Sequence, residues 1–149
     1  MLEVGNKGLT IAEQRTHFAL WAIMASPLLI GSDVSKLTPT SLSILGNVDI
    51  TAVNQDSLGV QGLPVGGSTA DVRTASCWYK PLAGGSIAAM VINTGGNTTE
   101  LACKLSDLGV TKTPKAITDL WAKKPVVATG GVIRASLESH DHMFVKITF

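Results

Sequence analysis

The sequence has 149 residues, enough for one ordinary domain or two small ones. Apolar residues make up 45% of it, as a globular core requires, while charged residues make up only 15%, below the roughly 25% usual in soluble domains. The net charge of +1 gives no electrostatic reason to expect nucleic acid or an anionic membrane as a partner.

No segment has the pattern of a membrane span or of a secretory signal. The longest apolar run, residues 18–31, is interrupted by Pro27 and is shorter than the roughly twenty residues that a membrane helix needs. The first residues have no basic stretch followed by an apolar one. We therefore expect no membrane helix, and we expect any signal to lie outside this sequence.

The first sixty residues have an α/β pattern that begins with an apolar helix. Thr10 and Glu13 have the spacing of a capping box, which predicts a helix start. The helix should be apolar on nearly every face up to residue 25, so more than one side needs cover, and Pro27 should end it. Residues 28–31 form a short apolar run, which is typical of a strand buried on both faces of a parallel sheet.

Two shorter helices should follow. Thr38 and Pro39 suit the N-cap and first turn of a helix that runs to residue 45, and Gly46 suits its end. A further helix is expected at residues 50–54.

After about residue 62 the pattern changes to short alternating runs separated by glycine, which predicts an antiparallel β-sandwich. We expect strands at residues 72–80, 86–93, 98–105, 116–121, 132–137 and 143–149. In the last of these, one face should be buried and the other wetter. The buried face has Met143, Val145, Ile147 and Phe149, and the wetter face has Phe144, Lys146 and Thr148.

The two patterns divide the chain into residues 1–61, of α/β type, and residues 62–149, of all-β type. The first region cannot close a core alone, because a parallel strand needs neighbours on both edges and an apolar helix needs cover. We therefore expect it to be part of a larger structure or to associate with another copy of the chain.

Five sequence blocks in the first region resemble the late barrel segment of glycoside hydrolase family 27, the α-galactosidases or melibiases. The blocks are MLEVGN at 1–6, LT at 9–10, HFALWA at 17–22, SPLLIG at 26–31 and VNQDSLG at 53–59. Trp78, the DLW at 119–121 and the HD at 140–141 resemble the β domain of the same family, with looser motifs.

This resemblance implies a secreted, retaining exo-glycosidase that acts on terminal α-linked galactose. It implies that residues 1–61 are the last segment of a (β/α)8 barrel and that residues 62–149 are an antiparallel β-sandwich domain. Retention of configuration needs two carboxyl groups about 5 Å apart. In the family both are aspartates that precede every residue present here, and a third aspartate, which binds galactose, directly precedes the position of Met1.

The resemblance therefore assigns no catalytic residue to this chain and a substrate-lining role to Met1 alone. It implies α-galactoside sugars as the ligands of the intact enzyme, and it implies no cofactor and no metal. We expect the chain by itself to be inactive.

Cys77 and Cys103 are too few for a disulfide framework and lack metal-ligand spacing, so they form either one bridge or two buried thiols. Asn97 begins an Asn-Thr-Thr sequon in a glycine-rich turn, which makes it a candidate glycosylation site.

Other residues with reactive side chains have structural explanations. Asp33 follows the predicted parallel strand, on the side where barrels place their sites, but a capping carboxylate is the simpler interpretation. Asp49 and Asp56 should bond backbone amides. His17 should be a core histidine. His140 and His142 suggest a metal pair, but neighbouring strand residues point to opposite faces and no third ligand is evident.

The tryptophans Trp21, Trp78 and Trp121 could stack on sugar, but core or interdomain packing is the simpler expectation. The main alternative to an enzyme portion is a non-catalytic β-sandwich protein, lectin-like or interacting with a partner. A third hypothesis is an assembly in which copies complete one another's cores.

Overall fold

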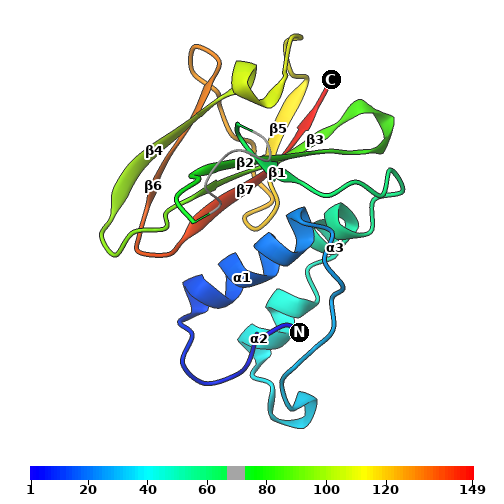
Figure 1. Ribbon diagram of the computed structural model, residues 1–149, viewed down its shortest axis with the longest axis vertical. Coiled ribbons are helices and arrows are strands. Elements are labelled where there is room, and N and C mark those ends of the chain that lie inside the picture. The colour runs from blue at the N-terminus through cyan, green and yellow to red at the C-terminus, as the bar shows by residue number, and fades with distance from the viewer. Residues whose placement is uncertain (67–72) are drawn as a thin grey trace.

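The computed structural model describes residues 1–66 and 73–149. Three α-helices lie beneath a β domain, with the chain passing from the helices into the strands (Figure 1). The helices and 3-10 turns are α1 (Ile11–Ile23), η1 (Val34–Lys36), α2 (Pro39–Leu45), α3 (Val48–Asn54), η3 (Ala83–Gly85) and η4 (Leu105–Leu108). The strands are β1 (Leu63–Pro64), β2 (Cys77–Pro81), β3 (Ile87–Ile92), β4 (Thr99–Lys104), β5 (Ala116–Asp119), β6 (Val132–Leu137) and β7 (His142–Thr148).

The predicted helices are confirmed, with a change at one end. The capping box forms, because the Thr10 hydroxyl accepts from the Glu13 amide and the Glu13 carboxylate accepts from the Thr10 amide. Helix α1 ends at Ile23 rather than at residue 25, where Ala25 adopts a φ of 53°. It contacts α2 and α3 as well as β3 and β7, so its apolar surface is covered on more than one side as expected. The expectation that this cover must come from outside the chain is wrong for α1, because the β domain of the same chain supplies it.

The prediction of a strand at residues 28–31, buried on both faces, is wrong. Only Ile30 pairs, in an isolated parallel bridge with Leu2. Leu29 is 61% exposed and Ile30 is 44% exposed. The physical reason is that, within the described residues, neither edge of this two-strand bridge has a further strand beside it, so nothing covers the outward side chains.

The predicted β pattern is confirmed in type and order. Strands β1-β2-β3-β7-β5 form one antiparallel sheet, and β4-β6 form a second, two-stranded sheet that packs against it. The fifth expected strand ends at Asp119 rather than at residue 121, because the Asp119 carboxylate accepts the amides of Trp121 and Ala122 and turns the chain. The expected start at residue 72 lies outside the described residues, and the strand expected from there begins only at Cys77, because residues 73–76 form no strand.

The prediction that Phe144 faces a wetter side is wrong. Phe144 has no exposed surface, and neither has Ile147 on the opposite face of β7. Helix α1 packs against β7 on the side of Phe144, whereas the two-stranded sheet covers the side of Val145 and Ile147. The alternation therefore separates two cores, and Lys146 is the most exposed position of β7. Phe149, expected on the buried face, lies beyond the end of β7 and is 44% exposed.

The five-stranded sheet thus lies between two hydrophobic clusters. The first joins the helices to the sheet: Leu2, Val4, Phe18, Ala19, Ala22, Ile23, Ile44, Ile50, Val53, Trp78, Leu82, Ala88, Met90, Ile92, Leu120 and Phe144. The second fills the sandwich: Ala89, Val91, Cys103, Leu105, Leu108, Ile117, Ile133, Ala135, Leu137, Val145 and Ile147.

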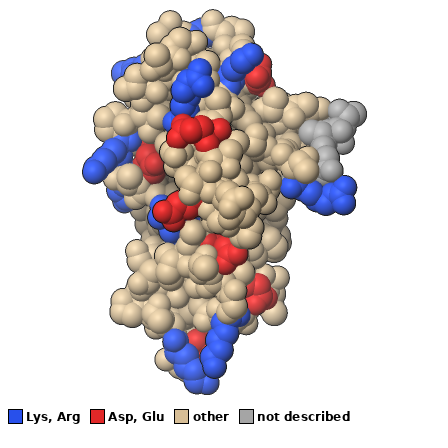
Figure 2. Space-filling view, turned by 90° about the vertical axis from the view of Figure 1, so that its left-hand side faces the viewer, with Lys and Arg blue, Asp and Glu red and all other residues tan. Residues whose placement is uncertain are grey.

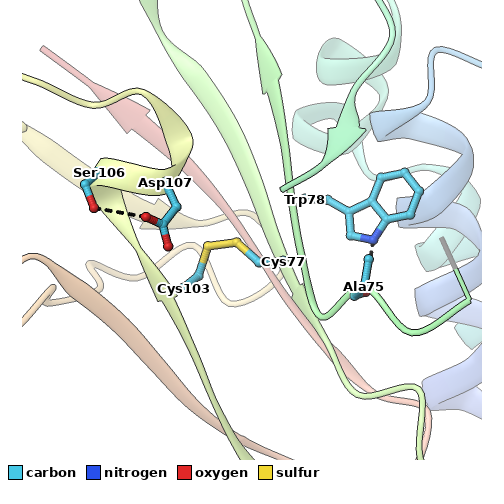
Figure 3. Close-up of a disulfide and its surroundings, with 6 residues drawn as sticks. All are labelled: Ala75, Cys77, Trp78, Cys103, Ser106 and Asp107. Atoms are coloured by element: carbon cyan, nitrogen blue, oxygen red, sulfur yellow. Dashed lines mark hydrogen bonds between the residues drawn. A yellow bond between two sulfur atoms is a disulfide. The ribbon is translucent and has the colours of Figure 1, made fainter. Parts of the chain in front are cut away.

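A disulfide between Cys77 and Cys103 joins the two sheets, with the Cα atoms 5.8 Å apart. Of the two states left open by the sequence, the bridge is the one present. Figure 3 shows Cys77 pointing into the sandwich, while the adjacent Trp78 points toward the helices. Among the described residues, no helix is both long and apolar enough to cross a membrane.

Candidate functional site

The resemblance gives a substrate-lining role to Met1, in the segment at residues 1–6 that meets residues 30–33. The amide of Leu2 donates to the Leu29 carbonyl at 2.6 Å, and the amide of Gly31 donates to the Leu2 carbonyl at 2.9 Å. The two segments run in the same direction, so both leave the bridge at the same edge. In barrels this carboxyl edge carries the reactive groups.

Gly31 allows the two segments to approach this closely. A Cβ atom built there would lie 2.8 Å from the Leu2 carbonyl oxygen and 3.1 Å from the Met1 Cβ. Met1 itself is 71% exposed. The backbone at this edge is therefore closely packed, while the Met1 side chain, to which the resemblance gives a substrate-lining role, is exposed to solvent.

Helix α1 holds the loop that follows the first segment. The Gln14 side chain accepts the amide of Gly5 at 3.0 Å and donates to the Leu9 carbonyl at 3.2 Å. His17 Nε2 accepts the amide of Glu3 at 3.0 Å. Burial lowers the pKa of His17, and the neighbouring Glu3 carboxylate opposes that shift. His17 is therefore a half-buried residue that holds backbone, close to its expected role.

The carboxylates at this edge are occupied by local partners. Glu3 accepts from Asn6 Nδ2 at 2.6 Å. Asp33 caps η1 through the Ser35 amide and pairs with Lys36 at 2.8 Å, as the capping interpretation predicted. Lys36 and then Ser35 lower the pKa of Asp33. A lowered pKa does not favour the role of general acid, and the capping contacts support the structural interpretation of Asp33.

The other acidic residues also have structural partners. Asp56 accepts the amides of Leu58 and Ala83, as expected. Asp49 instead pairs with Lys123 at 3.2 Å, across to the loop after β5.

The two histidines considered as a metal pair have separate partners. His140 Nδ1 lies 2.9 Å from Glu13 Oε1. The pKa of Glu13 falls to about 2, chiefly because the Thr10 amide and then His140 stabilise its charge. His142 lies fully buried between helix α1 and the loop after β5.

The His142 ring is held by one donor and one acceptor. Trp121 Nε1 donates to His142 Nε2 at 2.7 Å. Since Nε2 accepts, the neutral ring carries its proton on Nδ1 and donates it to Thr16 Oγ1 at 2.7 Å. Thr16 in turn donates to the His140 carbonyl at 2.8 Å. Burial, followed by the Arg15 charge, lowers the pKa of His142 to about 3.

The three tryptophans do not form a common platform. Trp78 is buried, and its indole donates to the Ala75 carbonyl at 3.2 Å. Trp21 stacks at 4.2 Å from the His17 ring, and Trp121 lies under the Arg15 guanidinium, 4.6 Å from its centroid. The packing interpretation is therefore favoured over sugar stacking.

Two further features concern residues outside the barrel edge. Asn97 is exposed in the turn between β3 and β4, and its carbonyl, not its side chain, accepts from Asn93 and Thr99. Lys80, which the sequence analysis missed, has no exposed surface, and its Nζ donates to the Val53 carbonyl at 2.5 Å. Burial lowers the pKa of Lys80. In the sequence, burial of Lys80 was indicated only by its place in an alternating strand among apolar residues.

Comparison with known families matches both parts of the chain. The family model described as "Alpha galactosidase A" matches residues 1–56. The model described as "Alpha galactosidase C-terminal beta sandwich domain" matches residues 72–147.

Curated relatives extend over nearly the whole chain. The α-galactosidase of Coffea arabica is 38% identical over 149 residues, covering 99% of this chain and 38% of the relative. That of Oryza sativa is 39% identical over 150 residues, covering 99% of this chain and 34% of the relative. The chain therefore spans little more than a third of the length of these relatives.

Solved structures agree with the sequence matches. The α-galactosidase I of Mortierella vinacea superposes with a TM-score of 0.87 at 26% identity, covering 99% of this chain and 38% of that one. A putative α-galactosidase/melibiase from Bacteroides fragilis gives a TM-score of 0.84 at 28% identity, covering 99% and 33%.

Proposed function

Because the chain belongs to the glycoside hydrolase family 27 α-galactosidases, as their C-terminal portion, we propose that it completes an enzyme that hydrolyses terminal α-linked galactose. In this proposal residues 1–61 supply the last segment of the barrel and residues 62–149 supply the β domain. The observation that carries it is the parallel bridge of Leu2 and Ile30, whose two segments leave at one edge like neighbouring strands of a barrel.

The chemistry of this proposal needs two carboxyl groups in catalytic roles. A retaining mechanism uses one carboxylate as nucleophile and one carboxylic acid to protonate the leaving oxygen. At the barrel edge Glu3 and Asp33 are held by Asn6, Ser35 and Lys36. Both catalytic carboxyl groups are therefore proposed to come from the part of the barrel that precedes these residues in the relatives.

The chain's own residues then position the substrate side of the site. Met1, next to the bridge and beside Gly31, lines the galactose pocket in this proposal, with its exposed side chain free to contact the sugar. His17 and Gln14 fix the following loop through the amides of Glu3 and Gly5. The role of α1 at this edge is to hold backbone.

The exposed apolar side chains of the first region support the proposal that further barrel elements pack against it. Met1, Leu29 and Val34 are each more than 60% exposed, as is Val48. Barrel strands and helices contributed by the rest of the enzyme would cover this surface. In their absence we propose that it drives self-association. Secretion of the whole enzyme is part of the same proposal.

The test is hydrolysis of an aryl α-galactoside by two purified proteins. One is the 149-residue chain, and the other is a chimera that joins the preceding barrel portion of the Coffea arabica relative to residues 1–149. We expect no turnover by the chain alone and turnover of the α-anomer, but not the β-anomer, by the chimera. An Asp33→Asn chimera, altered only in the cap of η1, should remain active.

Two results would contradict the proposal. One is activity of the chain alone that survives repurification. The other is a chimera that melts cooperatively and still hydrolyses no α-galactoside.

A further inference from the structure

A groove of about 780 Å³ opens at the end of the β domain, on the side away from helices α1 to α3. One wall is η4 with residues 110–117, and the other is the turn at residues 126–132. These segments are the yellow and orange parts at the top of Figure 1, while the helices lie at the bottom. The groove is therefore separate from the barrel edge described above.

Backbone hydrogen bonds hold both walls in place. The amide of Leu105 donates to the Gly131 carbonyl at 2.9 Å, and the amide of Val110 donates to the Leu105 carbonyl at 3.0 Å. The amide of Val126 donates to the Ile117 carbonyl at 2.8 Å. The disulfide at Cys103 anchors β4 just before η4. The backbone of both walls is thus tied to neighbouring strands and turns.

The groove is lined by positive charge. Lys104, Lys112 and Lys115 all line it, and no carboxylate does. None of these lysines forms a salt bridge with any residue that the structure describes. The nearest acidic group on this wall is Asp107, which accepts from Ser106 at 3.2 Å. Figure 2 shows basic side chains at this end of the molecule, together with acidic ones, and further basic side chains at the helical end.

The lining also indicates what kind of anion fits. Its volume lies within the roughly 300–1,000 Å³ typical of small-molecule sites, which accommodates a short oligomer. Thr111 and Thr113 supply hydroxyls, and glycines at 130 and 131 leave the rim open. No aromatic ring lines the groove, so the stacking surface that a neutral sugar would use is absent from the described lining.

We propose that this groove binds an acidic oligosaccharide, in which sugar carboxylates pair with the three lysines and sugar hydroxyls meet the threonines. The anionic character of the ligand rests on the groove alone, while its saccharide nature rests on the proposed function. The groove would hold the enzyme on a polysaccharide whose backbone is acidic and whose branches end in α-linked galactose.

The test is titration of the chain with a trimer of galacturonic acid, followed by amide NMR shifts and calorimetry. A neutral galactose trimer and an aspartate trimer serve as competing ligands. We expect the galacturonate trimer to bind at low ionic strength, to weaken as salt is added, and to shift the amides of the two walls. Neither competitor should bind as tightly.

Charge reversal locates the site. Lys112→Glu combined with Lys115→Glu should weaken binding by about tenfold or more, because two attractive charges become repulsive. The matched control, Lys7→Glu combined with Lys36→Glu, makes the same change in net charge at the helical end and should leave the affinity unchanged.

Three outcomes would overturn the inference: equal weakening by both pairs of substitutions, equal binding of the neutral trimer, or equal binding of the aspartate trimer. Because the readout is binding, its failure is distinct from that of the proposed function. A chimera that hydrolyses α-galactosides and a chain that binds no galacturonate would overturn the groove assignment alone.

Discussion

The buried ring of His142 should make the free energy of unfolding depend on pH in a defined window. In the unfolded chain its pKa is about 6.5, whereas burial and the Arg15 charge lower it to about 3 in the folded protein. At pH values between about 3 and 6.5, the unfolded state therefore binds a proton at this ring and the folded state does not. Stability is complete above about pH 6.5 and is lost as the pH falls toward 3.

The magnitude follows from the same two values. The loss approaches about 1.4 kcal/mol per pH unit, so the protein should be about 2 kcal/mol less stable at pH 5 than at pH 8 because of this residue. The Trp121 contact agrees in direction, because protonation of Nε2 would break the hydrogen bond that Nε2 accepts. The Asp141 carboxylate, 3.7 Å from Nδ1, acts in the opposite direction, and burial and the Arg15 charge outweigh it.

The assay is urea unfolding at pH 8, 7, 6 and 5, followed by tryptophan fluorescence, since Trp121 contacts the ring directly. His17, whose pKa is also lowered by burial, adds a loss of the same sign in this window. The His142→Gln variant separates the two. It should be less stable at pH 8 but should lose less stability on acidification, by about 2 kcal/mol at pH 5.

His140→Gln is the matched control, because it makes the same change two residues away at a part-exposed side chain paired with Glu13. It should keep the dependence of the unmodified protein on pH. If the free energy of unfolding is flat from pH 8 to 5, or if His142→Gln keeps the full slope, the assignment of a buried neutral ring is refuted.

Three further predictions concern the fold and its modification. Replacing Cys77 and Cys103 by serine should lower the free energy of unfolding by about 3 kcal/mol, since the bridge closes a loop between residues with a sequence separation of 26. Urea unfolding with and without reductant measures this loss. An effect of reductant on the variant equal to that on the unmodified protein would contradict it. Gly62→Ala should destabilise by about 1–3 kcal/mol, because its Cβ would lie 2.7 Å and 3.0 Å from two backbone carbonyl oxygens, whereas Gly96→Ala, with no atom within 4 Å, should change the melting temperature little. Expression in a secreting eukaryotic host should add an N-glycan at Asn97, removed by glycosidase and absent from Asn97→Gln; an identical intact mass for the two proteins, apart from the substitution, would rule it out.

Local signals were sufficient for the helices and strands. The start of α1 needs only Thr10 and Glu13, and that of α2 needs only Thr38 and Pro39, because a cap and its partners lie within one turn. Alternation located the β strands for the same reason. These elements could be predicted because their determining contacts are close in sequence.

The failures came from contacts between distant parts of the chain. Phe144 alternates with core residues as a solvent-facing residue would, and only the packing of α1 against β7 buries it. His142 meets Thr16 across 126 positions and Trp121 across 21, which no local pattern contains. Of the groove lysines, Lys112 and Lys115 lie in a loop and Lys104 ends β4, so no local pattern places the three together.

The sheet with a core on each face limits how this protein can exchange modules with its relatives. A recombination point near residue 62 separates the two patterns of the sequence. The hydrophobic cluster between the helices and the sheet, however, contains side chains from both sides of that point. Trp78, Met90 and Phe144 are buried by residues on the helical side of that point. A β domain taken from another family member must therefore match the foreign helices on one face while keeping its own sandwich on the other. Hybrids with a matched helical face should fold, and mismatched ones should expose the sheet.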